Sequence, residues 1–387
     1  MKSILAFEPY DSLSHETFRR CVCRDGSFQW NWVHLPGHGY KWRMRLGAHE
    51  MIQMADHMDM LNKVPDAIVV TSLCNTAELR GCLPPHLRTV PVILYMHENQ
   101  CAYPDREMVG ELQEKFDAHM PLVNLSSLLA ADMVIFNSDW NRRSCLDGLE
   151  QWMAHARQSK LGHWRESIEN KSHVAWPPVD LDEAQARSFR NRREFMDPEK
   201  SVLHNLIISD HCRIAWPHRW EHDKNPPGLL EAMEQLEERP GCTWSIPGPQ
   251  FSRQPESFIE AHERFGHRID HSGFISDRLA YLDELASCHW VISTARQEFF
   301  GIAVCEAMLA GCLPWLPERL SYTELLTEKA RKLSPLNPPS DPSEIVRLQA
   351  EHLKPALSMN AVNRIESLVS EAIEMHSEAW QTTRSHA

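Results

Sequence analysis

Residues 290–307 read WVISTARQEFFGIAVCEA. The apolar run Trp290–Ser293 has the length of a buried strand, and the residues that follow Gly301 form a helical pattern. A glycine at this junction lets a ligand approach the backbone N–H groups at the start of the helix, where an anion binds well. The segment therefore predicts a β–α unit of a parallel sheet with a phosphate-binding turn.

Similar apolar runs alternate with helix-like segments along the chain. Most are rich in valine and isoleucine without polar alternation, as in strands that are buried on both faces. The strands expected in the first half are Ile4–Phe7, Trp30–His34, Ala67–Thr71, Val90–Met96, Met133–Phe136 and His173–Trp176. Those expected in the second half are Arg213–Trp216, Thr243–Ile246, Arg268–His271, Trp290–Ser293 and Cys312–Leu316.

A polar, charged stretch at residues 180–211 separates the two series and is typical of an interdomain linker. The chain of 387 residues is also too long for one ordinary core. We therefore predict an α/β fold with two Rossmann-like domains. The expected segments are a domain at 1–185, a linker at 186–211, a domain at 212–360 and a tail at 361–387. Apolar residues at 362, 365, 368, 369, 372 and 373 give this tail one amphipathic helix face.

The apolar runs and the cysteines of the chain indicate where in the cell the protein is expected. The longest apolar runs are strand-sized, so no membrane span is expected, and residues 2–8 are expected to form the first strand rather than a secretion signal. The 11 cysteines include no C-x-x-C pair. Scattered, unpaired cysteines favour reduced thiols and a cytoplasmic location.

The formal net charge of −13 at first argues against a nucleic-acid partner. Residues 17–45 are a local exception, with Asp25 as the one acidic residue. Their basic residues are Arg19, Arg20, Arg24, Lys41, Arg43 and Arg45, and their larger aromatic residues include Trp30, Trp32, Tyr40 and Trp42. This stretch is compatible with docking an anionic polymer. The alternative is a charged helix and loop whose tryptophans belong to the core.

Three polar segments stand where strands are expected to end. Glu298 and Glu306 are about two helical turns apart, so both side chains can point into one cleft. The segment WPHRWEHDKNP at 216–226 holds Arg219 and Lys224 and follows the first strand of the second domain. The segment His97–Gln100 ends the fourth expected strand, and Asn137–Ser138 ends the fifth. Ligands of doubly wound sheets bind at such carboxyl ends, although surface ion pairs or a structural histidine remain the alternatives.

The segment from Glu298 to Glu306 resembles the E-x7-E motif of retaining GT-B glycosyltransferases, which have two Rossmann-like domains facing across a cleft. The resemblance implies that Glu298 binds hydroxyls of the donor sugar and that Glu306 binds the donor ribose. Phe300, Gly301 and Ile302 would complete the donor site. Arg219 and Lys224 would hold the diphosphate without a metal and stabilise its charge as it leaves.

A larger set of segments resembles one family, the tRNA-queuosine α-mannosyltransferases, from residue 4 to about residue 325. The matching segments are Glu8-Pro9-Tyr10, Ser14-His15, Lys41 to Arg45, His97 to Gln100, Phe136 to Ser138, Trp216 to Pro226 and the segment that begins at Glu298. The resemblance implies transfer of mannose from GDP-mannose to queuosine in the anticodon of tRNA-Asp. It also implies retention of configuration, for which we expect a front-face mechanism assisted by the donor phosphate.

The resemblance also assigns roles to residues. The catalytic residues would be His97, Glu298, Arg219 and Lys224. The acceptor-binding residues would be Ser14, His15, Lys41, Arg43, Arg45, Glu98, Asn99, Gln100, Asn137 and Ser138. No metal and no cofactor other than the sugar nucleotide are expected.

One position departs from the family pattern, and other functions stay open. Many relatives have a Gly-Gly pair where this chain has Ser12-Leu13, which puts the donor contacts of that loop in question. The open alternatives are a glycosyltransferase with a lipid or polysaccharide acceptor, an inactive binding protein, and a sugar-nucleotide epimerase of the same fold.

Overall fold

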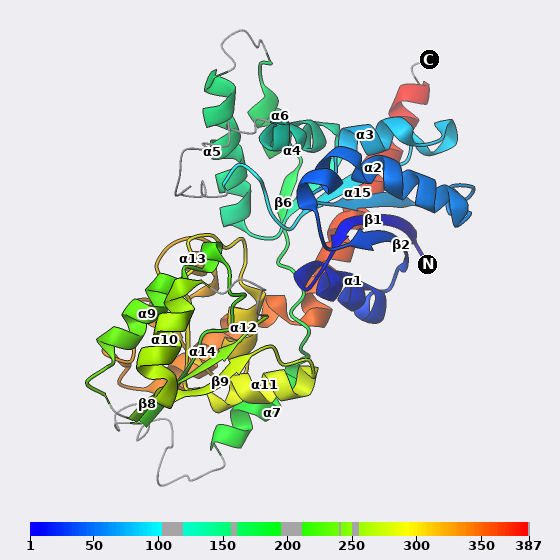
Figure 1. The fold of residues 1–387 in the computed structure, drawn as a ribbon. Coiled ribbons are helices and arrows are strands. Elements are labelled where there is room, and N and C mark those ends of the chain that lie inside the picture. Colours follow the sequence, from blue (N-terminus) through cyan, green and yellow to red (C-terminus); the bar gives the residue numbers. More distant parts are fainter. Residues whose placement is uncertain (103–118, 156–160, 195–210, 240, 250–254, 386–387) are drawn as a thin grey trace. The chain divides into compact units, whose positions relative to one another are not determined.

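The computed structural model describes all residues except 103–118, 156–160, 195–210, 240, 250–254 and 386–387. The chain divides into two compact units (Figure 1). Unit 1 comprises Met1–Asp180 and Ser358–Ala387, and unit 2 comprises Leu181–Leu357. Each unit contains one sheet with helices on its faces, so the predicted pair of α/β domains is confirmed.

Unit 1 is built on a parallel six-stranded sheet in the order β2-β1-β3-β4-β5-β6. The strands are β1 (Ser3–Asp11), β2 (Gln29–Pro36), β3 (Ala67–Thr71), β4 (Val92–Met96), β5 (Met133–Phe136) and β6 (Ser172–Val174). Alternate residues of β1 enter different cores: Leu5 and Phe7 pack on one face, and Ile4 and Ala6 on the other. Burial on both faces explains why these strands lack polar alternation.

Helices cover both faces of this sheet. They are α1 (Ser14–Asp25), α2 (Tyr40–His57), α3 (Thr76–Cys82), α4 (His119–Ala130), α5 (Asp139–His155), α6 (Trp164–Glu169) and α15 (Ser358–Ser385), with the 3-10 turn η1 (Pro85–Leu87). The chain runs from β1 outward to β2 and then returns to β3 on the other side of β1. The strand order therefore reverses between β1 and β3, and such a reversal is where doubly wound sheets bind ligands.

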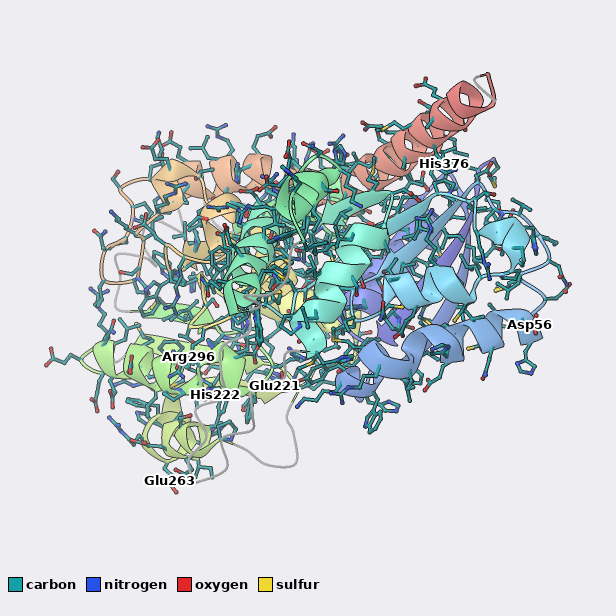
Figure 2. All side chains as sticks on the ribbon, turned by 90° about the horizontal axis from the view of Figure 1, so that it is seen from above. Asp56, Glu221, His222, Glu263, Arg296 and His376 are labelled. Atoms are coloured by element: carbon teal, nitrogen blue, oxygen red, sulfur yellow. The ribbon has the colours of Figure 1, made fainter. Side chains whose placement is uncertain are left out.

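The C-terminal helix α15 belongs to unit 1, not to a separate tail. Its apolar face, including Val362, Ile365 and Leu368, is buried in the core on one face of the sheet. The buried carboxylate of Glu366 accepts hydrogen bonds from the segment that joins α1 to β2 and from Trp30 Nε1. Farther along the helix lies His376, which Figure 2 labels. Its Nε2 is 2.7 Å from the Thr89 carbonyl oxygen.

Unit 2 contains a parallel five-stranded sheet in the order β11-β10-β7-β8-β9. The strands are β7 (His211–Ala215), β8 (Gly241–Pro247), β9 (Ile269–Gly273), β10 (Trp290–Ile292) and β11 (Leu313–Trp315). Its order reverses between β7 and β10, the two strands that precede the predicted donor-binding segments. All five strands overlap the segments expected from the sequence.

The helices of unit 2 are short. They are α7 (Glu183–Glu194), α9 (Pro226–Gln235), α10 (Glu256–Phe265), α11 (Arg278–Ser287), α12 (Ile302–Leu309), α13 (Tyr322–Leu325) and α14 (Pro342–His352). The 3-10 turns are η2 (His222–Lys224), η3 (Gly266–Arg268), η4 (Glu328–Ala330) and η5 (Lys354–Ala356).

The boundary between the units differs from the expected linker at 186–211. Residues 183–194 form helix α7 of unit 2, in which Ala186 and Phe189 are buried. Arg190 Nη1 donates to the Leu309 carbonyl oxygen at 2.9 Å, which attaches α7 to the end of α12. In the sequence, the many charged residues of α7 make its narrow apolar face difficult to recognise. The remainder of the expected linker, 195–210, lies outside the described residues.

The cysteines are unpaired, and most are buried. Within the part of the chain that the structure describes, every helix is too short or too polar to cross a lipid bilayer.

Candidate active site

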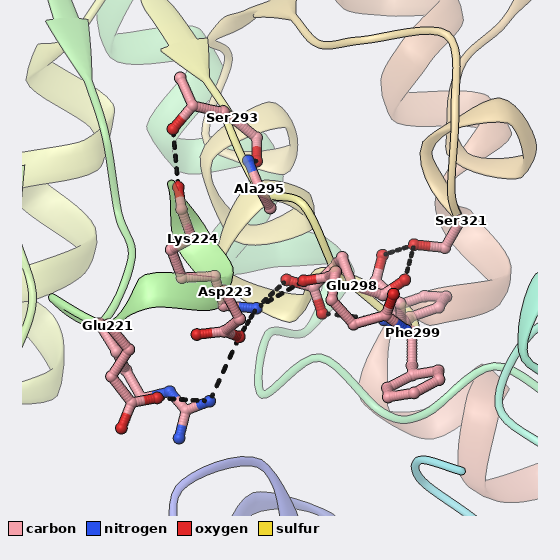
Figure 3. Close-up of polar contacts among 12 residues, drawn as sticks. Glu221, Asp223, Lys224, Ser293, Ala295, Glu298, Phe299 and Ser321 are labelled. Carbon is pink, nitrogen blue, oxygen red and sulfur yellow. Dashed lines mark hydrogen bonds and ion pairs between the residues drawn. The ribbon is translucent and has the colours of Figure 1, made fainter. Parts of the chain in front are cut away.

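The predicted donor residues of unit 2 gather at the switch between β7 and β10. Lys224 follows β7, and Glu298 follows β10. Lys224 Nζ lies 3.1 Å from Glu298 Oε2 and 3.2 Å from Asp223 Oδ2, as Figure 3 shows. It also donates to the Gln297 carbonyl oxygen at 3.1 Å. Two segments that are distant in the sequence thus form one charged cluster at the carboxyl edge of the sheet.

Lys224 is held as a buried cation, with 8% of the residue exposed. Burial by itself lowers the pKa of Lys224, but the facing carboxylates of Glu298 and Asp223 outweigh burial and raise this pKa above its usual value. The ammonium group is therefore charged at neutral pH. A fixed cation in a dry environment can stabilise negative charge that develops on a bound group.

Arg219 is the more exposed member of the predicted pair. Its Nη2 lies 3.2 Å from Glu221 Oε2 and 3.9 Å from Asp223 Oδ2. The Arg219 side chain is 38% exposed, so it keeps access to solvent and to an incoming anion. Asp223 lies near both cations and links them, a role that sequence reasoning missed.

Gly301 has the backbone geometry that the turn requires. Its φ is +99°, and it caps the N-terminus of α12. A Cβ at this position would lie 3.2 Å from Tyr322 Cε1, so a side chain would be both strained and crowded. Phe300 is buried, and its carbonyl oxygen accepts from Ser321 Oγ at 2.9 Å. A donor contact from Phe300 would therefore have to come from its backbone, whereas Ile302 is partly exposed.

Glu306 is buried and pairs with a cation of its own. Arg278, at the start of α11, places Nη2 2.5 Å from Glu306 Oε1. The same carboxylate acts on Tyr281, whose pKa is raised well above its usual value by burial and by Glu306. The structure thus assigns the two glutamates of the motif to different cations, and nothing in the sequence pointed to Arg278.

Two further polar side chains lie beside the Lys224 cluster. His218 Nε2 and Gln297 Nε2 are buried and have no hydrogen-bond partner among the described residues. Burial, together with the charge of Lys224, lowers the pKa of His218 to about 3, so its ring is neutral. Gly248 leaves room for this segment, because a Cβ there would lie 2.0 Å from the His218 carbonyl oxygen. Buried unpartnered nitrogens are suited to binding a ligand.

In unit 1, the polar residues at the ends of β4 and β5 mainly bind one another. Asn99 Nδ2 donates to Asn141 Oδ1 at 2.8 Å, and Asn99 Oδ1 accepts from two backbone N–H groups. Asn137 Nδ2 donates to the His97 carbonyl oxygen at 2.7 Å, and Ser138 Oγ accepts from Asn141 N. These bonds hold the loop after β4 in one shape, so contacts of Asn99 and Asn137 with an acceptor stay a prediction.

The other members of this group differ in exposure. Gln100 Nε2 donates to Glu98 Oε1 at 2.8 Å, and both residues are partly exposed. His97 is buried, and its ring packs against the buried ring of His15 with centroids 4.1 Å apart. His15 Nδ1 lies 3.0 Å from Glu8 Oε1. The structure therefore brings together His97 and His15 with Glu8, a residue to which the sequence assigned no role.

The Ser12-Leu13 departure has a structural consequence. Leu13 adopts φ of +36° at the N-cap of α1, and its side chain is 50% exposed. A Cβ on Gly37 would lie 2.2 Å from Ser12 Cβ, so this loop presses closely on the loop after β2. Leu13 thus keeps a backbone conformation that glycine adopts without strain. Ser14, which follows it, is exposed.

Residues 17–45 do not form the single aromatic and basic surface that the sequence predicts. Trp32 is buried, and Trp30 packs against the same core, so both belong to the interior. Arg19 binds Asp11, Arg20 and Arg24 bind Asp180, and Arg43 binds Glu50. Arg20 and Arg24 are exposed although they are ion-paired, and on the first turns of α2 Trp42 is 64% exposed between the partly exposed Lys41 and Arg45. We call Lys41, Trp42 and Arg45 the α2 patch.

A cavity of about 310 Å³ also lies in unit 2, between α7 and α14. Arg187, Arg347 and Lys354 line it, and Glu183 and Glu351 partly offset their charge. The predicted donor residues do not line this cavity, so it plays no part in the candidate site.

Two family models match the chain. One, described as tRNA-queuosine alpha-mannosyltransferase N-terminal, covers residues 3–179. The other, described as Glycosyl transferases group 1, covers residues 206–330. The second match includes Arg219, Lys224, Glu298 and Glu306, which supports reading unit 2 as a glycosyltransferase domain.

Solved structures share the fold at low sequence identity. Anabaena Alr3699/HepE in complex with UDP superimposes with a TM-score of 0.53 and 14% identity over 100% of both chains. The N-terminal domain of Candida albicans trehalose-6-phosphate phosphatase gives a TM-score of 0.63 and 11% identity, with 96% of this chain and 97% of that chain covered. These likenesses confirm the GT-B type of architecture and show the fold alone.

The comparison with one relative identifies the family. The tRNA-queuosine alpha-mannosyltransferase of Drosophila melanogaster is 35% identical over 295 residues, which cover 75% of this chain and 72% of that protein. The family expected from the sequence motifs is therefore confirmed by an overall match and by the N-terminal family model. This chain belongs to the tRNA-queuosine alpha-mannosyltransferase family.

Proposed function

We propose that this chain transfers a mannosyl group from GDP-mannose to queuosine in the anticodon of tRNA-Asp, with retention of configuration. The observation that carries the proposal is the Lys224–Glu298 ion pair at the switch point of unit 2, in a chain of this family. The pair joins a cation for the leaving diphosphate to a carboxylate for the donor sugar.

The chemistry of the donor side follows from charge. When the glycosidic bond breaks, the nucleoside diphosphate gains negative charge, which Lys224 can stabilise without reorganising. Arg219 has the exposure needed to leave Glu221 and bind a phosphate oxygen. Glu298, fixed by Lys224, would accept hydrogen bonds from hydroxyls of the donor sugar. Glu306, fixed by Arg278, would bind the ribose in the same way.

We further propose that transfer needs no divalent metal ion, because Lys224 and Arg219 supply the positive charge. Transfer should proceed at its full rate after exhaustive treatment with EDTA, and added Mg²⁺ or Mn²⁺ should not raise it. Strict dependence on either ion would overturn this part of the proposal and would leave the acceptor assignment open to its own test.

The acceptor side rests on the α2 patch. An exposed tryptophan between two cations can stack on an unpaired base while the cations bind phosphates. The anticodon loop presents both groups, and such contacts weaken with salt. The large negative net charge elsewhere on the chain makes this local patch the preferred place for an RNA to dock. A tRNA acceptor also fits the cytoplasmic location that the unpaired cysteines suggest.

The decisive experiment incubates the purified chain with GDP-mannose and queuosine-containing tRNA-Asp, followed by mass spectrometry of the nucleosides. We expect queuosine to gain the mass of one hexose. tRNA-Asp that lacks queuosine is the matched control and should stay unmodified. UDP-glucose in place of GDP-mannose tests the donor. Donor consumption without tRNA would favour the epimerase alternative, and donor binding without turnover would favour an inactive binding protein.

A further inference from the structure

A buried carboxylate, Glu8, stands where the strand order of unit 1 reverses. The residue has no exposed surface, and both of its oxygens accept hydrogen bonds. Oε1 accepts from Tyr10 N at 2.8 Å and faces His15 Nδ1 at 3.0 Å, while Oε2 accepts from Thr71 Oγ1 at 2.8 Å. Glu8 thus links β1, β3 and α1 at the edge of the sheet where ligands of this fold bind.

The contact with Glu8 fixes the ring of His15. An ionised carboxylate only accepts hydrogen bonds, so His15 Nδ1 carries the proton between them. Burial by itself lowers the pKa of His15, but the charge and hydrogen bond of Glu8, with smaller contributions from Glu98 and Asp11, raise this pKa above its usual value. Glu8 therefore favours the protonated, cationic form of His15 inside the protein.

His97 lies against this cation in the opposite state. The two rings are tilted by 33° with centroids 4.1 Å apart. Burial, followed by the charge of His15, lowers the pKa of His97 well below its usual value. Phe18 and Tyr95 contact the same ring at 4.8 Å and 4.7 Å between centroids, and Asn137 holds its backbone. The ring of His97 is thus neutral and fixed in orientation.

One atom of this cluster has nothing to bind. His97 Nε2 is buried without a hydrogen-bond partner among the described residues. Leaving such an atom unpaired is unfavourable, so an unpaired atom in a native protein calls for a functional explanation. A hydroxyl of a bound sugar can both donate to and accept from a neutral imidazole, and this makes it the fitting ligand.

We propose that Glu8 is a positioning residue for glycosyl transfer: through His15 it holds His97 so that Nε2 meets a hydroxyl of a bound sugar. The inference rests on the proposed function, because it takes a sugar as the ligand. Glu8 itself contacts no ligand. It acts by keeping one imidazole charged and in place against the other.

A metal ion is the competing explanation. One possible ligand atom from each of Glu8, His15 and His97 lies within 4.8 Å of the others. Two observations argue against it. Both oxygens of Glu8 already accept hydrogen bonds. The two imidazole rings contact each other directly, with centroids 4.1 Å apart and a tilt of 33°, rather than standing apart around a space for an ion. Metal binding is therefore treated as an alternative that the NMR experiment described next can detect.

The first test uses the unaltered protein and needs no substrate. Long-range ¹⁵N–¹H NMR of the imidazoles across pH should show His15 protonated and His97 neutral through the neutral range. If both histidines titrate near the ordinary histidine value, or if added Zn²⁺ binds stoichiometrically and shifts both rings, the proposal is overturned. This result is independent of the donor and the acceptor, so it separates failure of this inference from failure of the proposed function.

The second test is Glu8→Gln, which keeps the shape and removes the charge. We expect kcat to fall about 10- to 100-fold, the effect of a misplaced reacting group, with little change in donor KM. Without Glu8 the pKa of His15 falls, so the cation is lost at a lower pH. Activity of the variant relative to the wild type should therefore rise as pH falls. A ratio that stays constant with pH would indicate a merely structural role and contradict the proposal.

Two comparisons sharpen this test. Glu366→Gln alters another buried carboxylate of unit 1, whose hydrogen bonds in the described part of the chain come from Ser27, Phe28 and Trp30, and its activity ratio should not vary with pH. In a His97→Phe background, Glu8→Gln should cause little further loss, because Glu8 acts through His97. Losses that multiply in the double variant would show that Glu8 acts by another route.

Discussion

Lys224 Nζ lies 3.1 Å from Glu298 Oε2, although 74 positions separate the two residues in the chain. The parallel pairing of β7 with β10 produces this contact, because it ends both strands at the same edge of the sheet. The cation that would face the diphosphate and the carboxylate that would face the sugar are therefore held at a fixed spacing.

Removing this cation should mainly affect turnover. Lys224→Ala is expected to lower kcat by about two to three orders of magnitude, since a fixed charge that stabilises the leaving group is lost. Steady-state kinetics with saturating tRNA measure the effect. Lys329→Ala, a change at an exposed lysine of the same unit, serves as the control and should leave kcat unaltered. A Lys224→Ala variant within a factor of about two of the wild type would remove this residue from the mechanism.

The two glutamates of the motif should give different kinetic signatures. Glu298→Ala is expected to reduce kcat, because the residue would contact the transferred sugar. Glu306→Ala is expected to raise the KM for the donor, because the residue would hold the ribose.

Arg278 provides an internal check on Glu306. Because Arg278 Nη2 lies 2.5 Å from Glu306 Oε1, Arg278→Ala should raise donor KM in the same direction as Glu306→Ala, and the double variant should be less affected than the product of the two. An unchanged donor KM in both single variants would rule out the ribose role.

The α2 patch should govern tRNA binding. Replacing Lys41 and Arg45 together with alanine should weaken binding and flatten its salt dependence, since phosphate contacts are lost. Trp42→Ala should weaken binding by about 1–3 kcal/mol if it stacks on one base. Filter binding at two salt concentrations measures both effects. Donor affinity should stay unchanged in these variants.

Matched controls exist in the same unit. Lys63→Ala removes an exposed cation outside the patch, and Met54→Ala removes a partly exposed apolar side chain farther along α2. Neither should alter tRNA binding. Arg43 is left out of the test because its side chain is 13% exposed and pairs with Glu50. An unaltered Kd and salt slope in the Lys41, Arg45 and Trp42 variants would exclude the patch as the docking surface.

Helix α15 should stabilise unit 1, although it lies at the far end of the chain. Leu368 is fully buried in the core on one face of the sheet. Leu368→Ala should therefore cost about 2–5 kcal/mol of unfolding free energy. Met375→Ala, at an exposed position of the same helix, should cost little. Thermal unfolding of both variants measures the difference, and equal midpoints would show that α15 does not stabilise unit 1.

The elements of the fold were largely predictable. The strands are short apolar runs between more polar segments. Because both faces of each strand are buried, the residues of the strand alone are enough to recognise it. The positions of Arg219, Lys224 and Glu298 after strands were predictable for the same reason, because strand ends share an edge in a parallel sheet. The prediction that residues 186–194 belong to a linker was wrong, because they form part of helix α7. The sequence did not indicate this helix, since its apolar face is narrow and lies between charged residues.

Which polar residues are free to meet a ligand could not be predicted. Asn99 and Asn137 are occupied by internal hydrogen bonds, and Trp32 is in the core, whereas Trp42 is exposed. Exposure and pairing depend on neighbours that are distant in the chain. The types and spacing of residues in the sequence do not show which residues become neighbours in the fold.

The sequence by itself determined the α/β fold, the approximate strands, the family and the segments that carry charge, because local patterning and motifs are properties of short stretches. Only the tertiary structure decided that Glu8, His15 and His97 form one buried cluster, that Glu306 pairs with Arg278, and that α15 returns to unit 1. These contacts join segments that are far apart in the chain, and the free energy that places them comes from burial and pairing across the whole fold.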